Sequence, residues 1–164
     1  AFWMLGSNYC EAPAFDSDGN VFCDSSNPEF EEGNVLWPQS GEIDIMEAVN
    51  LKVKDAAGNV ESNVHGTLHY GKPWPNNSSS GKNYTLPGSK NPADDFHTYA
   101  VEWQQGEIRW YVDDYLYATQ RQSEVRLNSK DQAVGLKHRG WFTEYFDQTS
   151  GKLNTYWTSA PFNL

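Results

Sequence analysis

Three acidic residues lie close together in the segment Gly41–Asn50, and no basic residue stands among them. Glu42 and Asp44 are two positions apart, so on a β-strand they project from one face, with hydrophobic neighbours on the other. In a regular strand Glu47 would point to the hydrophobic face, where a lone buried carboxylate is costly. A β-bulge near Ile45 adds one residue and returns Glu47 to the face of the other two acids. We therefore predict a bulged strand that presents three carboxyl groups on one patch.

Carboxyl groups this close together cannot all ionise at low cost. At least one pKa is expected to rise, so that one group keeps its proton near neutral pH. A protonated carboxyl beside an ionised carboxylate is what a glycoside hydrolase uses. Spacing alone leaves two other interpretations open, a solvated acidic strand face and a calcium site built from oxygen ligands.

The elements that must position this patch are short strands and turns. Helical periodicity is nearly absent, and in the segment from Phe96 to Gln120 apolar and polar residues alternate between turn residues. Such an antiparallel meander excludes a doubly wound parallel sheet, which needs crossover helices. The long connections at 7–39 and 72–95 are typical of cleft walls. We predict an all-β sandwich.

Composition excludes several classes of function. The chain has 164 residues, enough for one domain, and its net charge of −10 disfavours binding to nucleic acid or to an anionic membrane. No apolar run reaches the roughly 18 residues of a membrane span, and no signal-peptide pattern opens the chain. The residues Ala1–Leu5 are typical of the middle of a buried strand, so we interpret the chain as an excerpt of a longer protein.

Two cysteines, Cys10 and Cys23, lie thirteen positions apart in a turn-rich stretch. Two thiols alone cannot hold a structural zinc ion, which takes four ligands. We expect a disulfide that closes this loop, worth roughly 3 kcal/mol, and hence an oxidising compartment; two unrelated thiols are the alternative. Between them, Asp16–Asn20 resembles a calcium loop only faintly, and an Asx-rich turn accounts for it better.

The segment WPQSGEIDIMEAVN, with E-x-D-x-x-E at its centre, resembles the active-site signature of glycoside hydrolase family 16. Its spacing is similar to the laminarinase-like (endo-1,3-beta-glucanase) branch and longer than the E-x-D-x-E of the lichenase branch. The segments AFWMLG, VHGTLHYGKPWP, FHTYAVEWQQGEIRWYVDD and APFNL resemble the same branch, in the same order along nearly the whole chain. The resemblance implies a concanavalin A-like β-jelly roll with a long cleft, and endo-hydrolysis of β-1,3-glucan with retention.

The family's strands before AFWMLG and after APFNL are missing from the sequence. We therefore expect residues 1–164 to be the central portion of a single catalytic β-sandwich domain, truncated at both ends and left with exposed sheet edges. On its own this portion should be poorly stable and weakly active or inactive.

Carried over by the resemblance, Glu42 is the expected nucleophile and Glu47 the expected general acid/base. Asp44 would share a hydrogen bond or a proton with Glu42 and help to set the pKa values. A retaining mechanism needs the two working carboxyls about 5–5.5 Å apart.

Histidines and tryptophans are the candidate substrate-binding residues. His65 and His69 are four positions apart on the strand that follows the acidic one, so they share a face. If that face is the cleft, they contact a sugar or the acid/base carboxyl. If it is not, they are ordinary half-buried histidines. Trp37 and Trp103 are candidate platforms for sugar rings, as is Trp74, although isolated tryptophans more often belong to the core.

We predict a secreted, periplasmic or cell-surface retaining endo-β-1,3-glucanase that acts on laminarin-type polysaccharides as a monomer. No cofactor and no catalytic metal is expected, with a structural calcium ion left open for the full-length domain. The partner is a β-glucan, not nucleic acid or a membrane. The alternatives are a hydrolase of mixed-linkage glucan or of a marine galactan such as agar or carrageenan, or a non-catalytic glucan-binding module. The paired glutamates count against the module.

Overall fold

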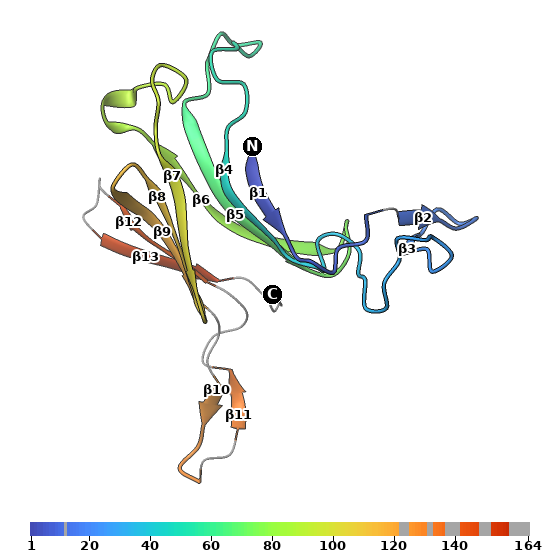
Figure 1. Ribbon diagram of the computed structural model, residues 1–164. Coiled ribbons are helices and arrows are strands. Elements are labelled where there is room, and N and C mark those ends of the chain that lie inside the picture. Colours follow the sequence, from blue (N-terminus) through green and yellow to red (C-terminus); the bar gives the residue numbers. More distant parts are fainter. Residues whose placement is uncertain (12, 122–124, 131–132, 137–141, 148–151, 158–164) are drawn as a thin grey trace.

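The computed structural model describes residues 1–164 except 12, 122–124, 131–132, 137–141, 148–151 and 158–164. In the described ranges the chain forms β-strands and one short 3₁₀ turn, η1 (Pro87–Ser89), and no α-helix (Figure 1). Nothing helical in these ranges is long and apolar enough to cross a membrane. The prediction of an all-β chain is confirmed.

One sheet carries the acidic segment. Its strands run in the order β1–β4–β5–β6, and each neighbouring pair is antiparallel. The bounds are Phe2–Leu5 for β1, Glu42–Glu47 for β4, Asn63–Gly71 for β5 and Asn77–Thr85 for β6. β4 is therefore a central strand, hydrogen-bonded on both sides.

The second sheet contains the predicted meander. Its order is β13–β12–β9–β8–β7, and the consecutive strands β7, β8 and β9 form antiparallel hairpins. The bounds are Tyr99–Gln104 for β7, Glu107–Val112 for β8, Tyr115–Arg121 for β9, Phe142–Asp147 for β12 and Lys152–Trp157 for β13. Two small hairpins stand apart from the sheets, β2 (Pro13–Phe15) with β3 (Val21–Cys23), and β10 (Val125–Leu127) with β11 (Ala133–Leu136).

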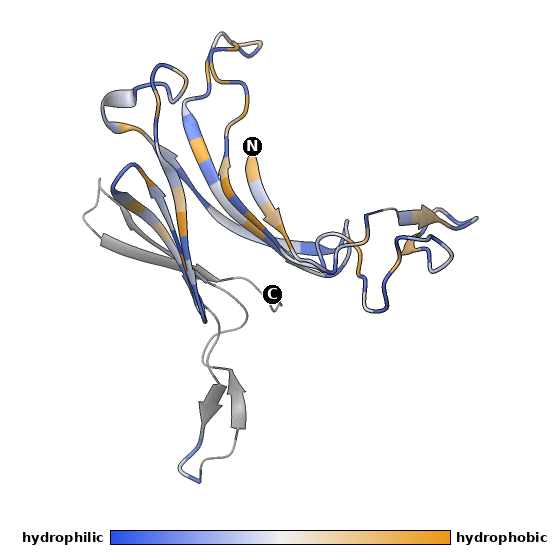
Figure 2. Cartoon of the chain, in the orientation of Figure 1, coloured by the Kyte–Doolittle hydropathy of each residue, from blue (hydrophilic) through white to orange (hydrophobic). Residues whose placement is uncertain are grey.

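The two large sheets pack face to face around a hydrophobic core (Figure 1). Alternate residues along β5 and β8 are buried. Apolar and polar colours alternate along strands of the sheet that carries the acids (Figure 2). The core includes Ile43, Val64, Leu68, Tyr70, Ile108, Trp110 and Val112. A polar bridge crosses it where the buried Gln120 side chain donates a 2.8 Å hydrogen bond to the carbonyl of Ser80. Burying these inward faces turns the other face of β4 toward solvent.

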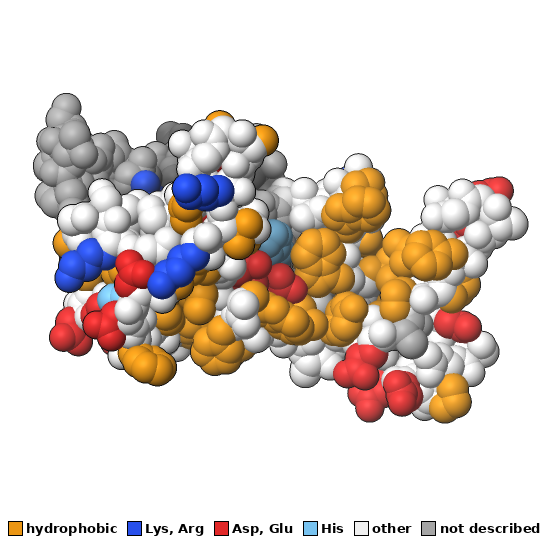
Figure 3. Space-filling model, turned by 90° about the horizontal axis from the view of Figure 1, so that it is seen from above, with side chains coloured by type: hydrophobic (Ala, Val, Ile, Leu, Met, Phe, Trp, Pro, Cys, Tyr) orange, Lys and Arg blue, Asp and Glu red, His pale blue; other side chains and the backbone are white. Residues whose placement is uncertain are grey.

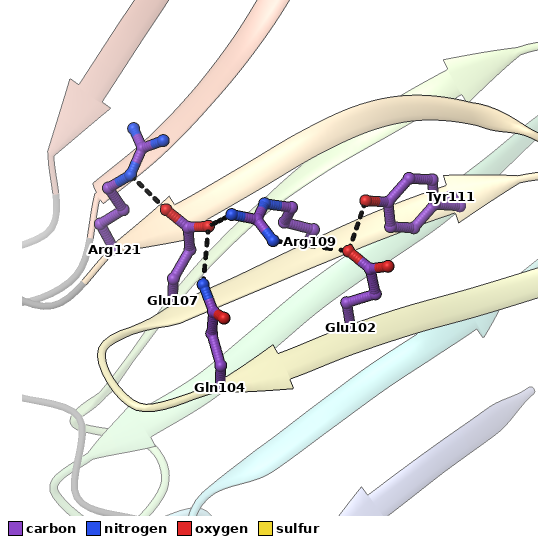
Figure 4. A network of polar contacts seen from close by, with 6 residues as sticks. All are labelled: Glu102, Gln104, Glu107, Arg109, Tyr111 and Arg121. Carbon is purple, nitrogen blue, oxygen red and sulfur yellow. Dashed lines mark hydrogen bonds and ion pairs between the residues drawn. The ribbon is translucent and has the colours of Figure 1, made fainter.

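The outer face of the second sheet carries charge pairs instead of a cleft (Figure 4). Glu107 pairs with Arg109 and with Arg121, and the hydroxyl of Tyr111 donates a 2.6 Å hydrogen bond to Glu102. Exposed pairs of this kind contribute little to stability individually. Their opposite charges neutralise one another across β7, β8 and β9.

A glycine makes room for the contact between the two sheets nearest the acids. The indole N–H of Trp110, on β8, crosses the core and donates a 2.8 Å hydrogen bond to the backbone carbonyl of Asp44, on β4. Gly66 lies on β5 beside this indole, and a Cβ atom at Gly66 would overlap Cδ1 of Trp110 and the hydroxyl of Tyr117. Any larger residue at position 66 would have to push Trp110 aside.

Both cysteines are free thiols in the structure, which corrects the expected disulfide. The two side chains are nevertheless neighbours, because Cys10 is buried and the Cys23 thiol hydrogen-bonds to it. Burial, together with that hydrogen bond, raises the pKa of Cys23 to about 12. At neutral pH Cys23 therefore stays protonated, and the thiolate needed for disulfide formation is scarce.

Oxidising the protein should join these neighbouring thiols. After treatment with an oxidant we expect loss of both free thiols and a gain of roughly 3 kcal/mol in the free energy of unfolding, because the bridge closes a loop of the unfolded chain. Thiol titration and urea unfolding with and without reductant measure this. A Cys23→Ser variant should show no gain; an equal gain in that variant would contradict the pairing.

Gly66→Ala should destabilise the sandwich by about 1–3 kcal/mol, since it overpacks the core against Trp110. Urea unfolding measures the loss. Ser79→Ala, an exposed change on the neighbouring strand β6, is the control and should stay within about 0.5 kcal/mol. Equal stability of Gly66→Ala and the parent would show that the indole does not need this space.

Candidate active site

The strand that carries the acids has the predicted bulge. Across β4 and β5, Asp44 stands opposite Thr67, and Glu47 stands opposite His65, so three steps along β4 match two along β5. Directly opposed residues share one face of a sheet, so Asp44 and Glu47 project the same way. Ile45, at the irregularity, is buried. The predicted return of Glu47 to the acidic face is confirmed.

Glu42 is held by a tryptophan from the preceding loop. It stands opposite His69 on β5 and so shares the acidic face. The indole Nε1 of Trp37 donates a 2.6 Å hydrogen bond to Glu42 Oε2. The ring of Trp37 also lies beside that of His69, with 5.6 Å between the ring centroids. Trp37 thus fixes one carboxyl oxygen and places an aromatic surface next to it; its role as a sugar platform stays a prediction.

Asp44 is fully buried and pairs with His69. Its Oδ2 lies 3.1 Å from His69 Nε2. An ionised carboxylate without water needs such a partner, because its charge is otherwise costly to bury. The sequence analysis placed both residues but did not predict their pairing. The alternation of residues on the two strands indicated that both side chains could share a face. Only the register of the strands shows that Asp44 and His69 lie together.

The electrostatics of the site favour a proton on Glu42 and a positive charge on His69. Burial raises the pKa of Glu42; the hydrogen bond from Trp37 opposes this, and the charge of Asp44 adds to the rise. The hydrogen bond with Asp44 raises the pKa of His69 against the effect of burial. The predicted rise of one carboxyl pKa is found at Glu42, but its main cause is burial, and the crowding by Asp44 is a smaller contribution. His69 keeps its proton to higher pH and can balance the acids around it.

His65 faces the same side but is engaged with the protein. Its Nδ1 lies 2.8 Å from Asn83 Oδ1, and its Nε2 lies 2.8 Å from Glu61 Oε1. Glu47, opposite it, is half-buried at the end of β4. Because both ring nitrogens have partners, His65 links β5 to Asn83 and Glu61 and offers no free nitrogen to a sugar.

Trp103 lies on a different side of the molecule from the acids. It stands opposite the buried Ile108, so it projects from the core-facing side of β7. There it lines a groove together with Leu5 and Ile43. The expectation of a platform beside the acids is therefore corrected, because the acids occupy the outer face of the other sheet. Alternation within a strand could not tell which face would be covered.

Trp3 takes the position expected of Trp103. It stands opposite Asp44 across β1 and β4, on the acidic face, and is 49% exposed. The sequence alone made Trp3 a weaker candidate for a sugar platform than Trp37. The apolar start of the chain indicated a strand there. The sequence did not show how that strand pairs with β4.

One group of side chains in the described ranges could hold a metal ion. Donor atoms of Glu42, Asp44 and His69 lie within 4.8 Å of one another. An imidazole among the donors suits zinc and similar ions better than calcium, which takes oxygen ligands. Two contacts already hold this group, the hydrogen bond from Trp37 to Glu42 and the ion pair between Asp44 and His69.

The face as a whole combines acids with aromatic surface. Seen from above, acidic side chains and a histidine lie in the middle of the molecule, with hydrophobic side chains gathered beside them (Figure 3). Two carboxyl groups, a buried third and a paired histidine can exchange protons with a bound molecule. The neighbouring rings offer flat surfaces to its apolar faces.

Comparisons with known proteins agree with this chemistry. The family model described as "Glycosyl hydrolases family 16" matches residues 29–159. The chain is 44% identical over 77 residues to "Glucan endo-1,3-beta-glucosidase A1" of Niallia circulans, covering 47% of this chain and 10% of that protein. It is 37% identical over 86 residues to "Beta-1,3-glucan-binding protein" of Penaeus monodon, covering 51% of this chain and 23% of that protein.

A solved structure is also similar, the laminarinase catalytic domain of Thermotoga maritima. The identity is 33%, the TM-score is 0.44, and the match covers 71% of this chain and 34% of that one. The chain therefore spans about a third or less of the length of each of these three proteins.

Removing the hydrogen bond from Trp37 should raise the pKa of Glu42 further, because that bond stabilises the ionised carboxylate. For Trp37→Phe we expect the pKa of Glu42 to rise further, because a hydrogen bond to the charged form is lost. Carboxyl NMR titration of the parent and the variant measures it. Trp3→Phe changes a ring on the same face without that bond and should leave the titration unchanged. A pKa that falls or stays the same in Trp37→Phe would contradict the assignment.

Proposed function

This chain belongs to glycosyl hydrolases family 16, and from that premise we propose that it carries the catalytic machinery of a retaining endo-β-1,3-glucanase. The observation that supports the proposal best is the bulge in β4, which puts Glu47 on the face of Glu42 and Asp44. The two packed sheets around one core agree with the jelly roll that the sequence resemblance implied, and they favour a single domain.

In the proposed reaction Glu42 attacks the anomeric carbon of a glucosyl unit while Glu47 gives its proton to the departing glycosidic oxygen. The bond between anomeric carbon and oxygen breaks, and a glycosyl ester forms on Glu42. Glu47, now ionised, takes a proton from water, which attacks the ester and releases the sugar with its configuration retained. One pair of carboxyl groups serves both steps.

The surrounding residues adjust the charge on the nucleophile. Glu42 must be ionised to attack, and its raised pKa sets the lower pH limit of the reaction. The Trp37 hydrogen bond and the charge of His69 both favour the ionised form, so they extend the working range to lower pH. Asp44 pairs with His69, and its charge adds to the rise in the pKa of Glu42.

A neutral β-1,3-glucan is the substrate we propose. The net charge of −10 disfavours sulfated galactans such as carrageenan, and the relative from Niallia circulans is named for this linkage. A polysaccharide is too large to enter a cell intact, which supports action in an extracellular, periplasmic or cell-surface location. All three acids come from one strand, so a monomer is sufficient for catalysis.

The second candidate is a non-catalytic β-1,3-glucan-binding protein. The similarity to the protein of that name from Penaeus monodon favours it. The two glutamates on one face count against it, because binding alone does not need a pair of carboxyl groups in a site that raises the pKa of one of them.

Release of reducing sugar from laminarin by the full-length protein separates these candidates. We expect activity in the parent, and a loss of about 10²–10⁴-fold in Glu47→Gln, because general acid/base catalysis contributes that much. Glu42→Gln should be at least as impaired, since it has no nucleophile. Glu102→Gln, an exposed acid on the other sheet, should retain full activity.

Lichenan and agarose in the same assay test the alternative substrates. Binding of laminarin by the parent without any sugar release would favour the binding module. Release from agarose but not from laminarin would overturn the proposed substrate while keeping the proposed chemistry.

A further inference from the structure

Glu42, Asp44 and His69 bring donor atoms of two kinds together on the acidic face. One carboxylate oxygen from each acid and one imidazole nitrogen lie within 4.8 Å of one another. The three residues come from the adjacent strands β4 and β5, and Glu42 stands directly opposite His69. Open zinc sites in proteins use three ligands of these kinds and leave the fourth position to water or to a bound molecule. The group therefore has the number and the kinds of donors that such an ion takes.

The Asp44 carboxylate has acceptor capacity that the protein around it does not use. Its side chain is only 1% exposed, and its Oδ2 lies 3.1 Å from His69 Nε2. Its other oxygen, Oδ1, is buried and accepts no hydrogen bond from the described residues. Burying a charged oxygen is costly unless it is hydrogen-bonded or coordinates a metal. Asp44 is one of the three donors, so its unpartnered oxygen points to a cation at this place.

Contacts around the group hold its donors in position before an ion arrives. The indole of Trp37 donates a 2.6 Å hydrogen bond to Glu42 Oε2, and its ring lies beside that of His69. Both acids lie on β4, which pairs with β1 on one side and with β5 on the other. Partners that orient metal ligands in this way strengthen binding of the ion, commonly by roughly 10–100-fold.

A cation can reach the group from solvent and is attracted to it. Glu42 is half-buried and the His69 side chain is 24% exposed, so the group is open on the acidic face. No Lys or Arg occurs between positions 41 and 50, and the net charge of the chain is −10. A surface lined by one sign of charge raises the local concentration of counter-ions. The ion binds the neutral imidazole, so it takes the place of the proton that His69 otherwise holds beside Asp44.

The imidazole decides between classes of cation. Calcium and magnesium prefer oxygen ligands, whereas zinc and copper(II) accept imidazole nitrogen. Two carboxylates together with one imidazole therefore favour a zinc-type ion over calcium, the ion that the acidic residues alone would suggest.

We propose that Glu42, Asp44 and His69 form a binding site for a zinc-type divalent ion, which reversibly blocks the acidic face. The ion is an inhibitor and takes no part in catalysis, because it occupies Glu42, the proposed nucleophile, and competes with the glucan for the same face. Binding of the ion does not depend on the proposed function, but the inhibition rests on it.

Calorimetric titration of the full-length protein with zinc chloride tests the site. We expect one ion to bind per protein, and calcium chloride to give no binding at the same concentrations. Removing a ligand should cost at least as much as removing the partner of a ligand, so His69→Gln and Glu42→Gln should each weaken zinc binding roughly tenfold or more. Glu42→Gln keeps the shape of the side chain, so it decides the matter if His69→Gln, which leaves Asp44 unpaired, does not fold.

His65→Gln is the matched control. It removes a histidine four positions away on the same strand, one whose two ring nitrogens are engaged with Asn83 and Glu61, so zinc binding should be unchanged. Cobalt(II) in place of zinc gives an independent readout, because its visible absorption reports the ligands around it. The absorption bands should be present in the parent and in His65→Gln, and much weaker in His69→Gln.

No zinc binding by the parent, or equal binding by the parent, His69→Gln and Glu42→Gln, would overturn the site. If the parent then still releases sugar from laminarin, the proposed function stands without it. With the site intact, zinc should raise the apparent KM for laminarin and leave kcat unchanged, and EDTA should restore the original KM; a KM that zinc leaves unchanged would overturn the competition. Zinc binding by a protein that releases no sugar would overturn the proposed function and the inhibition while keeping the site.

Discussion

A single hydrogen bond through the core connects the fold to the acidic face. Trp110 reaches from the second sheet to the carbonyl of Asp44, at the point where β4 departs from regular pairing. A bulge leaves its strand locally irregular, and an indole donor from the opposite sheet satisfies and holds the backbone there. Gly66 keeps the path of that indole open. The direction in which Glu47 points therefore depends on packing on the far side of the sheet.

The site is built in layers of decreasing burial. Asp44 is enclosed and paired with His69, Glu42 is half-buried and held by Trp37, and Glu47 stands half-buried at the strand end. Burial, together with the charge of Asp44, raises the pKa of Glu42. Three chemically similar acids thus lie in three different environments within six residues of chain.

Strand alternation and the cost of burying a charge were sufficient to predict the bulge, the all-β class and the shared face of His65 and His69. These features follow from period-two geometry within one segment. The pairing of His69 with Asp44, and the side on which Trp103 lies, depend on register and on which sheet covers which face, and these are set by contacts between distant segments. The connections 7–39 and 72–95 were predicted as cleft walls, and residues of both line a pocket beside Trp37, but turn-rich loops carry no periodicity from which its shape could be predicted.

Placing the three acids of the site on β4 separates their spacing from the loops around them. That spacing is set by covalent geometry along one strand and by one irregularity in its pairing. The β2–β3 hairpin forms its own small sheet and pairs with no strand of the acidic sheet. A change of length in that hairpin would therefore alter the surroundings of the acids and leave the distances between them as they are.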